Sequence, residues 1–335
     1  MPHPANELAL VADIGGTNTR CALARGREVL EATVRRYGNA EHPDLGSVLR
    51  RFIADEGGVD PAAACVAAAG PVRDEAVTMT NIAHWPTITK DALTRATGAE
   101  TVAILNDLQA QGHAIGHVDP ARTRTVIPFP EAGPHAAKLV IGVGTGFNSV
   151  PVYDAGGGRL VPPSESGHVN LPIRDPADLR LSQWIERLPP PLNFPSVEEA
   201  LSGRGIENIY AWLAEEDGAP GRLSAAEIMA AVADGSDPRA TRTAEAASRL
   251  LGTVAGNLAL LSLPFGGVWL VGGVARALAP LLAAMGFVEA FRDKGRFRPL
   301  MESFGVGVLE DDYAALTGSA SHLVGLLRAG GPSPA

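Results

Sequence analysis

The stretch LALVADIGGTNTRCALA, residues 8–24, places an aspartate, two glycines, a threonine and an asparagine between two apolar runs. The runs predict two strands joined by a tight turn, because glycine permits a sharp reversal and lets backbone amides approach a ligand closely. A turn that only reversed the chain would need neither Asp13 nor Thr17. Asp13 could hold a hydrated Mg²⁺, and the Thr17 hydroxyl with neighbouring amides could bind phosphate oxygens. An ordinary glycine-rich hairpin is the alternative interpretation.

Composition indicates a globular protein that is large enough for two compact domains. The chain has 335 residues, of which 46% are hydrophobic and 19% charged. Its net charge of −9 gives no electrostatic reason to approach nucleic acid. Cys21 and Cys65 lie in apolar stretches, which favours buried thiols in a reducing compartment over a disulfide or a metal pair. Without a signal-peptide pattern or a membrane-spanning run, a cytoplasmic protein is expected.

Strands and helices alternate along the chain. In the first third, apolar runs predict strands at 8–13, 19–24, 64–72, 76–80 and 101–107, and helical spacing predicts helices at 49–56 and 88–97. The pattern restarts at Lys138, where 138–160 again gives a strand, a Gly-Thr-Gly turn and a strand. A helix at about 241–263, a strand and turn at 267–275, and a helix near 313–328 follow. The sequence therefore predicts two related α/β halves.

The second glycine turn strengthens the case for a nucleotide site. Gly144, Thr145 and Gly146 follow an apolar strand, as Gly15, Gly16 and Thr17 do. Two such turns, one in each half, are what a nucleotide held between two domains would require. The chain has neither a P-loop nor a dinucleotide-binding fingerprint. A third turn, Gly272-Gly273, could face a nucleoside base, although a plain strand-to-helix turn explains it equally well.

Further motifs occur in a fixed order along the chain: TN…W (80–85, Asn81 to Trp85), ILNDLQAQ (104–111), ESGHVN (165–170), EEALSGRGIENIY (198–210), NLALLSLPFGGVWLVGGVA (257–275) and FRDKGRF (291–297). Together with DIGGTNTR and GTG, they resemble the bacterial glucokinase family from about residue 8 to 325. The resemblance implies a two-domain, actin-like (ribonuclease H-like) α/β ATPase fold with an interdomain cleft. It also implies transfer of the γ-phosphoryl group of ATP to the 6-hydroxyl of glucose.

Asp107 is the candidate catalytic base. A sugar hydroxyl is a poor nucleophile, so phosphoryl transfer needs a positioned carboxylate to accept its proton. Asp107 ends the predicted strand 101–107 and so faces the expected cleft. The alternative role, compatible with the first, is to cap the helix that follows.

Several polar side chains must converge on the hydroxyls of a bound sugar. The resemblance implies that glucose is bound by Asn106, Asp107, Glu165, His168 and Glu198. Glu198 could also be a solvated helix charge, and Glu199 beside it is a competing assignment. Glu165 and His168 lack a partnering cysteine cluster, so a zinc site is not expected. The absence of that cluster also points away from the related repressor-and-kinase (ROK) branch.

One residue departs from the family pattern. The second phosphate turn usually continues Gly-Thr-Gly, an apolar residue and glycine, whereas here Phe147 is followed by Asn148. Asparagine tolerates left-handed backbone geometry, but its amide would occupy space that a phosphate needs. Altered ATP affinity, another phosphoryl donor or weakened catalysis would follow.

The sequence thus predicts a Mg·ATP-dependent glucokinase, expected to be a homodimer as the resemblance implies. Its small domain is expected at 1–117 plus 313–335, and its large domain at 118–312. ATP and Mg²⁺ are the expected cofactors, with Asp13 organising the water shell of the metal. The nucleotide-binding residues are expected to be Asp13, Gly15, Gly16, Thr17, Asn18, Gly144, Thr145, Gly146, Gly272 and Gly273. A kinase for another hexose and a non-enzymatic sugar-binding regulator are the alternatives.

Overall fold

The computed structural model describes residues 8–79, 82–155 and 158–329. These residues form two compact units. Unit 1 comprises the described residues up to Pro120, Val152–Pro163 and the described residues from Asp311 onward; unit 2 comprises Ala121–Pro151 and Ser164–Glu310. The sequence prediction placed 152–163 in the larger domain, whereas here this segment belongs to unit 1. The reason is local packing, since the strand at Gly158–Leu160 lies against the C-terminal helix of unit 1.

Unit 1 is built on a mixed sheet. Its strands are β1 (Leu8–Ile14), β2 (Asn18–Arg25), β3 (Glu28–Val29), β4 (Arg35–Gly38), β5 (Ala63–Ala68) and β9 (Thr101–Asn106). The order is β3-β2-β1-β5-β9, with β4 also pairing with β2. β1 and β2 form an antiparallel hairpin, while β1, β5 and β9 run parallel with Ile14, Ala68 and Asn106 in register. The carboxyl ends of these three strands therefore meet at one edge of the sheet.

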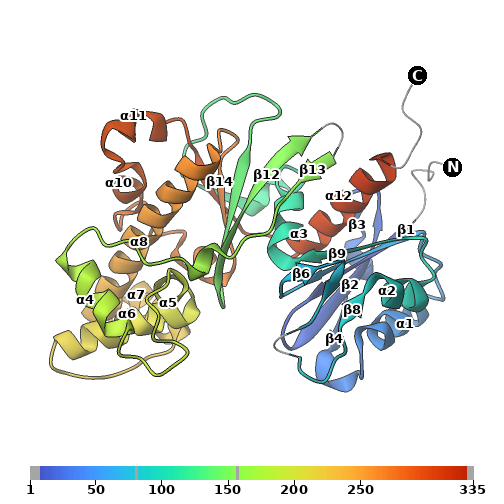
Figure 1. Ribbon diagram of the computed structural model, residues 1–335, viewed down its shortest axis with the longest axis horizontal. Helices are drawn as coiled ribbons and strands as arrows, with labels where there is room; N and C mark the ends of the chain where they lie inside the picture. The colour runs from blue at the N-terminus through green and yellow to red at the C-terminus, as the bar shows by residue number, and fades with distance from the viewer. Residues whose placement is uncertain (1–7, 80–81, 156–157, 330–335) are drawn as a thin grey trace. The chain divides into compact units, whose positions relative to one another are not determined.

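Helices cover both faces of this sheet (Figure 1). α1 (Leu45–Asp55) and α2 (Lys90–Thr97) bury Leu49, Phe52 and Leu93 on one face. α3 (Asp107–Ala114) and α12 (Ala314–Ala329) bury Ala110 and Leu316 on the other. Unit 1 also contains the short strands β6 (Val72–Arg73), β7 (Ala76–Val77), β8 (Ile88–Thr89) and β13 (Gly158–Leu160), and the 3₁₀ turns η1 (Glu31–Thr33) and η2 (Asn39–Glu41). The 3₁₀ turn η3 (Pro120–Arg122) spans the boundary with unit 2.

Unit 2 repeats the strand arrangement of unit 1. Its strands are β10 (Thr123–Ile127), β11 (Lys138–Val143), β12 (Phe147–Ala155), β14 (Val268–Val271) and β15 (Val306–Leu309), and the end of β12 passes into unit 1 to pair with β13. The order is β10-β15-β14-β11-β12. As β1 pairs in parallel with β5 and β5 with β9, so β11 pairs in parallel with β14 and β14 with β15. The two expected strand–turn–strand units thus occupy equivalent places in two sheets.

The helices of unit 2 enclose a single large core. They are α4 (Pro176–Ile185), α5 (Glu198–Leu201), α6 (Gly203–Glu216), α7 (Ala225–Asp234), α8 (Pro238–Ser262), α9 (Gly273–Leu278), α10 (Phe287–Arg292) and α11 (Arg298–Met301), with the 3₁₀ turns η4 (Ser166–His168) and η5 (Gly295–Phe297). α8 packs against both α6 and α10 and buries Leu250 and Leu251 beside Leu270 of the sheet. The rigid sheet and core hold the loops at the strand ends, where the predicted site residues lie.

Most of the longer predicted elements are confirmed, and the overall architecture is α/β. The strand expected at 76–80 is shorter, ending at Val77, and its Thr80 lies outside the described residues, as does Asn81 of the TN…W motif. Cys21 and Cys65 are buried free thiols, as expected. Within 8–79, 82–155 and 158–329, no helix combines the length and apolar character that crossing a membrane requires.

Candidate functional site

The first glycine turn joins β1 to β2 and is held from behind by a buried asparagine. The N–H of Gly15 donates to the carbonyl oxygen of Asn18 across the turn, at 3.0 Å. Asn39, only 2% exposed, donates from Nδ2 to the carbonyl oxygen of Gly15 at 2.8 Å, and its Oδ1 accepts from the Thr19 hydroxyl at 2.8 Å. Gly16 and Thr17 remain exposed. The turn therefore presents its tip outward, as a phosphate-binding turn would.

Asp13 and Asp107 influence one another electrostatically. Asp13 is the penultimate residue of β1, and Asp107 follows β9 at the same edge of the sheet. Burial first, and then the negative charge of Asp107, raise the pKa of Asp13 to about 6, although Arg20 acts in the opposite direction. A carboxylate whose charged form is disfavoured in this way is stabilised by a nearby cation.

Two neighbouring residues have different roles at the start of the helix after β9. Asn106 is the N-cap of α3, because its Oδ1 accepts from the N–H of Leu108 and Gln109 bonds back to the N–H of Asn106. Its Nδ2 also donates to the carbonyl oxygen of Gly70 at 3.1 Å. The alternative that Asp107 is the cap is thus wrong. Asp107 is the first helical residue, and its Oδ1 accepts from the N–H of Leu108 at 2.8 Å.

The second and third glycine turns meet at the carboxyl ends of β11 and β14. Within the second, the N–H of Gly144 donates to the carbonyl oxygen of Gly146 at 2.9 Å. Gly272 has a φ of 101°, and a Cβ there would lie 2.5 Å from the carbonyl oxygen of Val143, so only glycine fits. A Cβ on Gly144 would in turn lie 4.0 Å from the nitrogen of Gly273. The two predicted nucleotide turns of unit 2 are therefore adjacent.

The sugar-binding candidates of unit 2 also lie together. Glu165 precedes the 3₁₀ turn η4, which His168 ends, and both are exposed. The segment then runs beside the approach to α5, where the N–H of Val197 donates to the carbonyl oxygen of Val169 at 3.0 Å. A Cβ on Gly167 would lie 3.5 Å from the Cβ of Glu198. Glu165, His168 and Glu198 are thus brought together by the fold of unit 2.

Glu198 and its neighbour Glu199 have different environments, which separates the two competing assignments. Glu198 has an 18% exposed side chain whose Oε2 accepts from the N–H of Phe147 at 2.9 Å, so it is no solvated helix charge. Glu199 is buried and forms a bidentate ion pair with Arg204, at 2.9 and 2.6 Å. Arg204 also reaches Glu198, at 3.3 Å. Glu198 therefore faces the second turn, and Glu199 anchors the arginine that holds it.

The amide of Asn148 does not act as the sequence suggested. It was expected to intrude on the space of a phosphate, but it bonds instead to the backbone of Ser164 and Ser166, in the segment that carries Glu165. The sequence marks Asn148 but not this supporting role, and it does not indicate the supporting roles of Asn39 and Arg204. Arg204 lies in the conspicuous SGRG motif, 202–205, but no local pattern marks the role of Asn39.

The predicted site residues fall into two sets, one in each unit. Asp13, the first turn, Asn106 and Asp107 belong to unit 1, and the remaining turns with Glu165, His168 and Glu198 belong to unit 2. Over the part of the chain that the structure describes, no group of three or more His, Cys, Asp or Glu side chains could hold a metal by itself.

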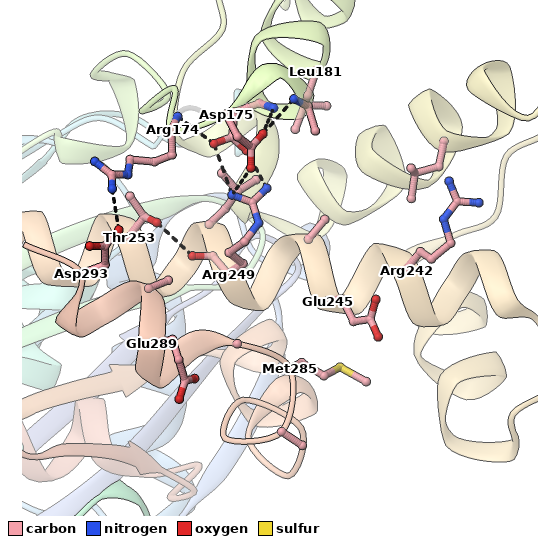
Figure 2. Close-up of a pocket in the computed structure, with 18 of the residues that line it drawn as sticks. Arg174, Asp175, Leu181, Arg242, Glu245, Arg249, Thr253, Met285, Glu289 and Asp293 are labelled. Atoms are coloured by element: carbon pink, nitrogen blue, oxygen red, sulfur yellow. Dashed lines mark hydrogen bonds and ion pairs between the residues drawn. The ribbon is translucent and has the colours of Figure 1, made fainter.

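A separate pocket of about 870 Å³ lies among α4, α6, α8 and α10 of unit 2 and contains none of these residues (Figure 2). Its floor includes Leu181 and Met285, and Asp178, 1% exposed, is paired there with Arg249 at 2.6 Å. Arg174 and Asp293 form an ion pair between exposed side chains at its margin. The pocket therefore lies outside the candidate site.

Comparison with known proteins identifies what this arrangement is similar to. The model of the glucokinase family matches residues 10–325. The glucokinase of Marinobacter nauticus is 33% identical over 320 residues, which are 95% of this chain and 98% of that protein. A crystal structure of glucokinase from an Antarctic psychrotroph has a TM-score of 0.83 at 27% identity and covers 94% of this chain and 98% of its own. A ROK-family glucokinase from Streptomyces griseus, crystallised with glucose and AMPPNP, shares the fold with a TM-score of 0.65 at 22% identity, covering 96% of this chain and 100% of its own.

Proposed function

The chain belongs to the glucokinase family, and we propose that it transfers the γ-phosphoryl group of ATP to the 6-hydroxyl of glucose with Asp107 as the general base. One observation carries the assignment of the base. Asp107 begins α3 at the carboxyl end of β9, close enough to Asp13 for its charge to raise the pKa of that residue. Ligands commonly bind at the carboxyl ends of parallel strands in open α/β sheets.

The local structure supports a catalytic role for Asp107. Because Asn106 caps α3, Asp107 is not required as the cap. The Leu108 N–H bond to Oδ1 orients the carboxylate at the start of the helix. As the 6-hydroxyl oxygen of glucose bonds to the γ-phosphorus, the bond from that phosphorus to the bridging oxygen breaks and ADP leaves. Asp107 accepts the hydroxyl proton, so no positive charge builds up on the attacking oxygen.

We assign glucose recognition to Asn106, Asp107, Glu165, His168 and Glu198. Carboxylates suit this work because each can accept from two hydroxyls. Part of the Glu198 side chain remains accessible to a sugar hydroxyl, since that side chain is 18% exposed. Arg204 and the Phe147 amide fix its orientation, which lowers the entropy that binding would otherwise cost.

We assign ATP to the glycine turns, with phosphates at Gly15, Gly16, Thr17 and Asn18 and at Gly144, Thr145 and Gly146, and the nucleoside at Gly272 and Gly273. The raised pKa of Asp13 fits a neighbouring cation, because Mg²⁺ would offset the repulsion between two carboxylates. Asp13 would hold Mg²⁺ through its water shell, with phosphate oxygens completing the coordination. The metal would supply charge neutralisation on the phosphates.

Family membership also supports proposals for the fold superfamily, the cellular location and the oligomeric state. We propose the actin-like, ribonuclease H-like ATPase fold, with glucose and ATP bound in a cleft between its two domains. Closure of such a cleft would exclude water and so limit ATP hydrolysis. We also propose a cytoplasmic homodimer.

A hexose panel tests the proposed activity. The purified protein is incubated with Mg·ATP and with glucose, mannose or N-acetylglucosamine, and ADP release is coupled to a dye while the sugar product is identified by mass and by chromatography. We expect glucose 6-phosphate as the main product. Turnover of only another hexose would instead establish a kinase for that sugar. Glucose binding by folded protein without ADP release would establish a sugar-binding regulator.

A further inference from the structure

Asn148 connects the strand after the second glycine turn to the loop that carries Glu165 and His168. Its Nδ2 donates to the backbone carbonyl oxygen of Ser164, and its Oδ1 accepts from the backbone N–H of Ser166 at 3.0 Å. One amide therefore holds the backbone on both sides of Glu165. We propose that Asn148 is a positioning residue that sets this loop for glucose, an inference that rests on the proposed function.

The loop needs such support because its candidate ligands are exposed. Glu165 and His168 are not buried, so their direction depends on the backbone that carries them. Gly167 between them is pressed against β12, where a Cβ would lie 2.0 Å from the carbonyl oxygen of Phe147. The hydroxyls of Ser149 and Ser166 are also within hydrogen-bond distance, at 2.8 Å. The loop thus packs along the start of β12, and Asn148 bonds directly to the main chain of the loop.

The same strand contacts the third sugar candidate. The N–H of Phe147 donates to Glu198, and Phe147 directly follows the turn Gly144–Gly146. Residues 147 and 148 therefore hold both groups of sugar ligands in unit 2, immediately after an expected phosphate turn. A residue without a polar side chain at position 148 could not make these bonds to the loop. Asn148 therefore adds a contact to the part of unit 2 that carries the proposed sugar-binding residues.

The amide must donate and accept at once, which allows a sharp choice of variants. Asn148→Gly removes both backbone bonds, together with those that Oδ1 accepts from the hydroxyls of Ser164 and Ser166. Asn148→Asp keeps an acceptor for Ser166 but turns a second acceptor toward the carbonyl oxygen of Ser164, so that bond becomes a repulsion. Asn257→Asp makes the same chemical change on an exposed position of α8 and is the matched control.

The experiment measures kcat and the KM values for glucose and ATP of the full-length wild type and the three variants, together with their melting temperatures. Calorimetry measures the affinity for glucose without nucleotide. We expect the KM and Kd for glucose to rise about tenfold or more in both Asn148 variants, as the loss of hydrogen bonds from Asn148 implies. The kcat and the KM for ATP should change little, and Asn257→Asp should behave as the wild type.

Two results would overturn the inference. One is an unchanged affinity for glucose in folded Asn148→Gly and Asn148→Asp. The other is a rise in the KM for ATP that exceeds the rise for glucose, which would place the amide at the phosphates. If Asn148→Gly does not fold, glucose binding by Asn148→Asp decides the matter. A wild type that binds glucose without turnover would refute the proposed kinase, while calorimetry would still test Asn148.

Discussion

Glu198 accepts a hydrogen bond from the backbone amide of Phe147, with Oε2 and N 2.9 Å apart. Phe147 is the first residue of β12 and directly follows Gly146. A proposed glucose ligand is therefore bonded to the main chain at the end of a proposed phosphate turn. This hydrogen bond fixes the position of a proposed glucose-binding side chain relative to the proposed phosphate-binding turn within unit 2.

The contrast between Glu198 and Glu199 gives the first prediction. Glu198→Gln should raise the KM for glucose with little change in stability, because the residue is partly exposed and keeps its shape. Glu199→Gln should lower the free energy of unfolding by about 1 kcal/mol, because the buried Glu199 loses its charge opposite Arg204, whose side chain is 38% exposed and therefore screened by solvent. Denaturant unfolding and steady-state kinetics on both variants measure these effects. The opposite pattern would show that the two assignments are exchanged.

Gly146 leaves room for the Glu198 carboxylate, which gives a second prediction. A Cβ at position 146 would lie 2.7 Å from Oε2 of Glu198, whereas a Cβ at Gly133 would meet nothing within 4 Å. Gly146→Ala should therefore displace Glu198 and raise the KM for glucose, and Gly133→Ala should leave the kinetics unchanged. Equal kinetic constants for the two variants would mean that the contact does not matter for binding.

A histidine pair in unit 1 makes stability depend on pH. His113 of α3 and His322 of α12 have ring centroids 4.5 Å apart. Burial is the main cause that lowers their pKa values, to about 3 for His113 and about 4 for His322. Because the unfolded chain binds protons near pH 6.5 and the folded protein does not, this stabilising contribution is complete above pH 6.5 and is lost as pH falls. At pH 5 each histidine should cost about 2 kcal/mol of unfolding free energy.

The pH prediction is checked by denaturant unfolding between pH 7.5 and 4.5. His113→Gln removes one titrating group and should flatten the dependence of unfolding free energy on pH. His135→Gln, at an exposed position, is the control and should leave the slope as in the wild type. Equal slopes for wild type and His113→Gln would contradict the assignment, whatever the absolute stability of the variant.

Local sequence predicts the two glycine turns, the strands that flank them and the long helix α8, because these depend on apolar runs, glycine and helical spacing over short distances. It does not predict β3, β4, β10 or β15, since strands this short acquire their structure by pairing with a neighbouring strand, which for β10 and β15 lies far along the chain. The hydrogen bond from Asn39 to the carbonyl oxygen of Gly15 could not be predicted from local sequence either, because the two residues are not close in the chain. The choice between Glu198 and Glu199 depends on which of these two adjacent residues of α5 faces the second glycine turn, and no motif defines that.

The account depends most directly on Asp107, and one measurement tests it: the kcat of Asp107→Asn beside its affinity for glucose. The amide keeps the shape of the side chain but is a far weaker base, so kcat should fall at least about a hundredfold, the usual contribution of a general base. Calorimetric binding of glucose should stay close to that of the wild type. A folded Asp107→Asn protein with nearly full kcat would contradict the central claim.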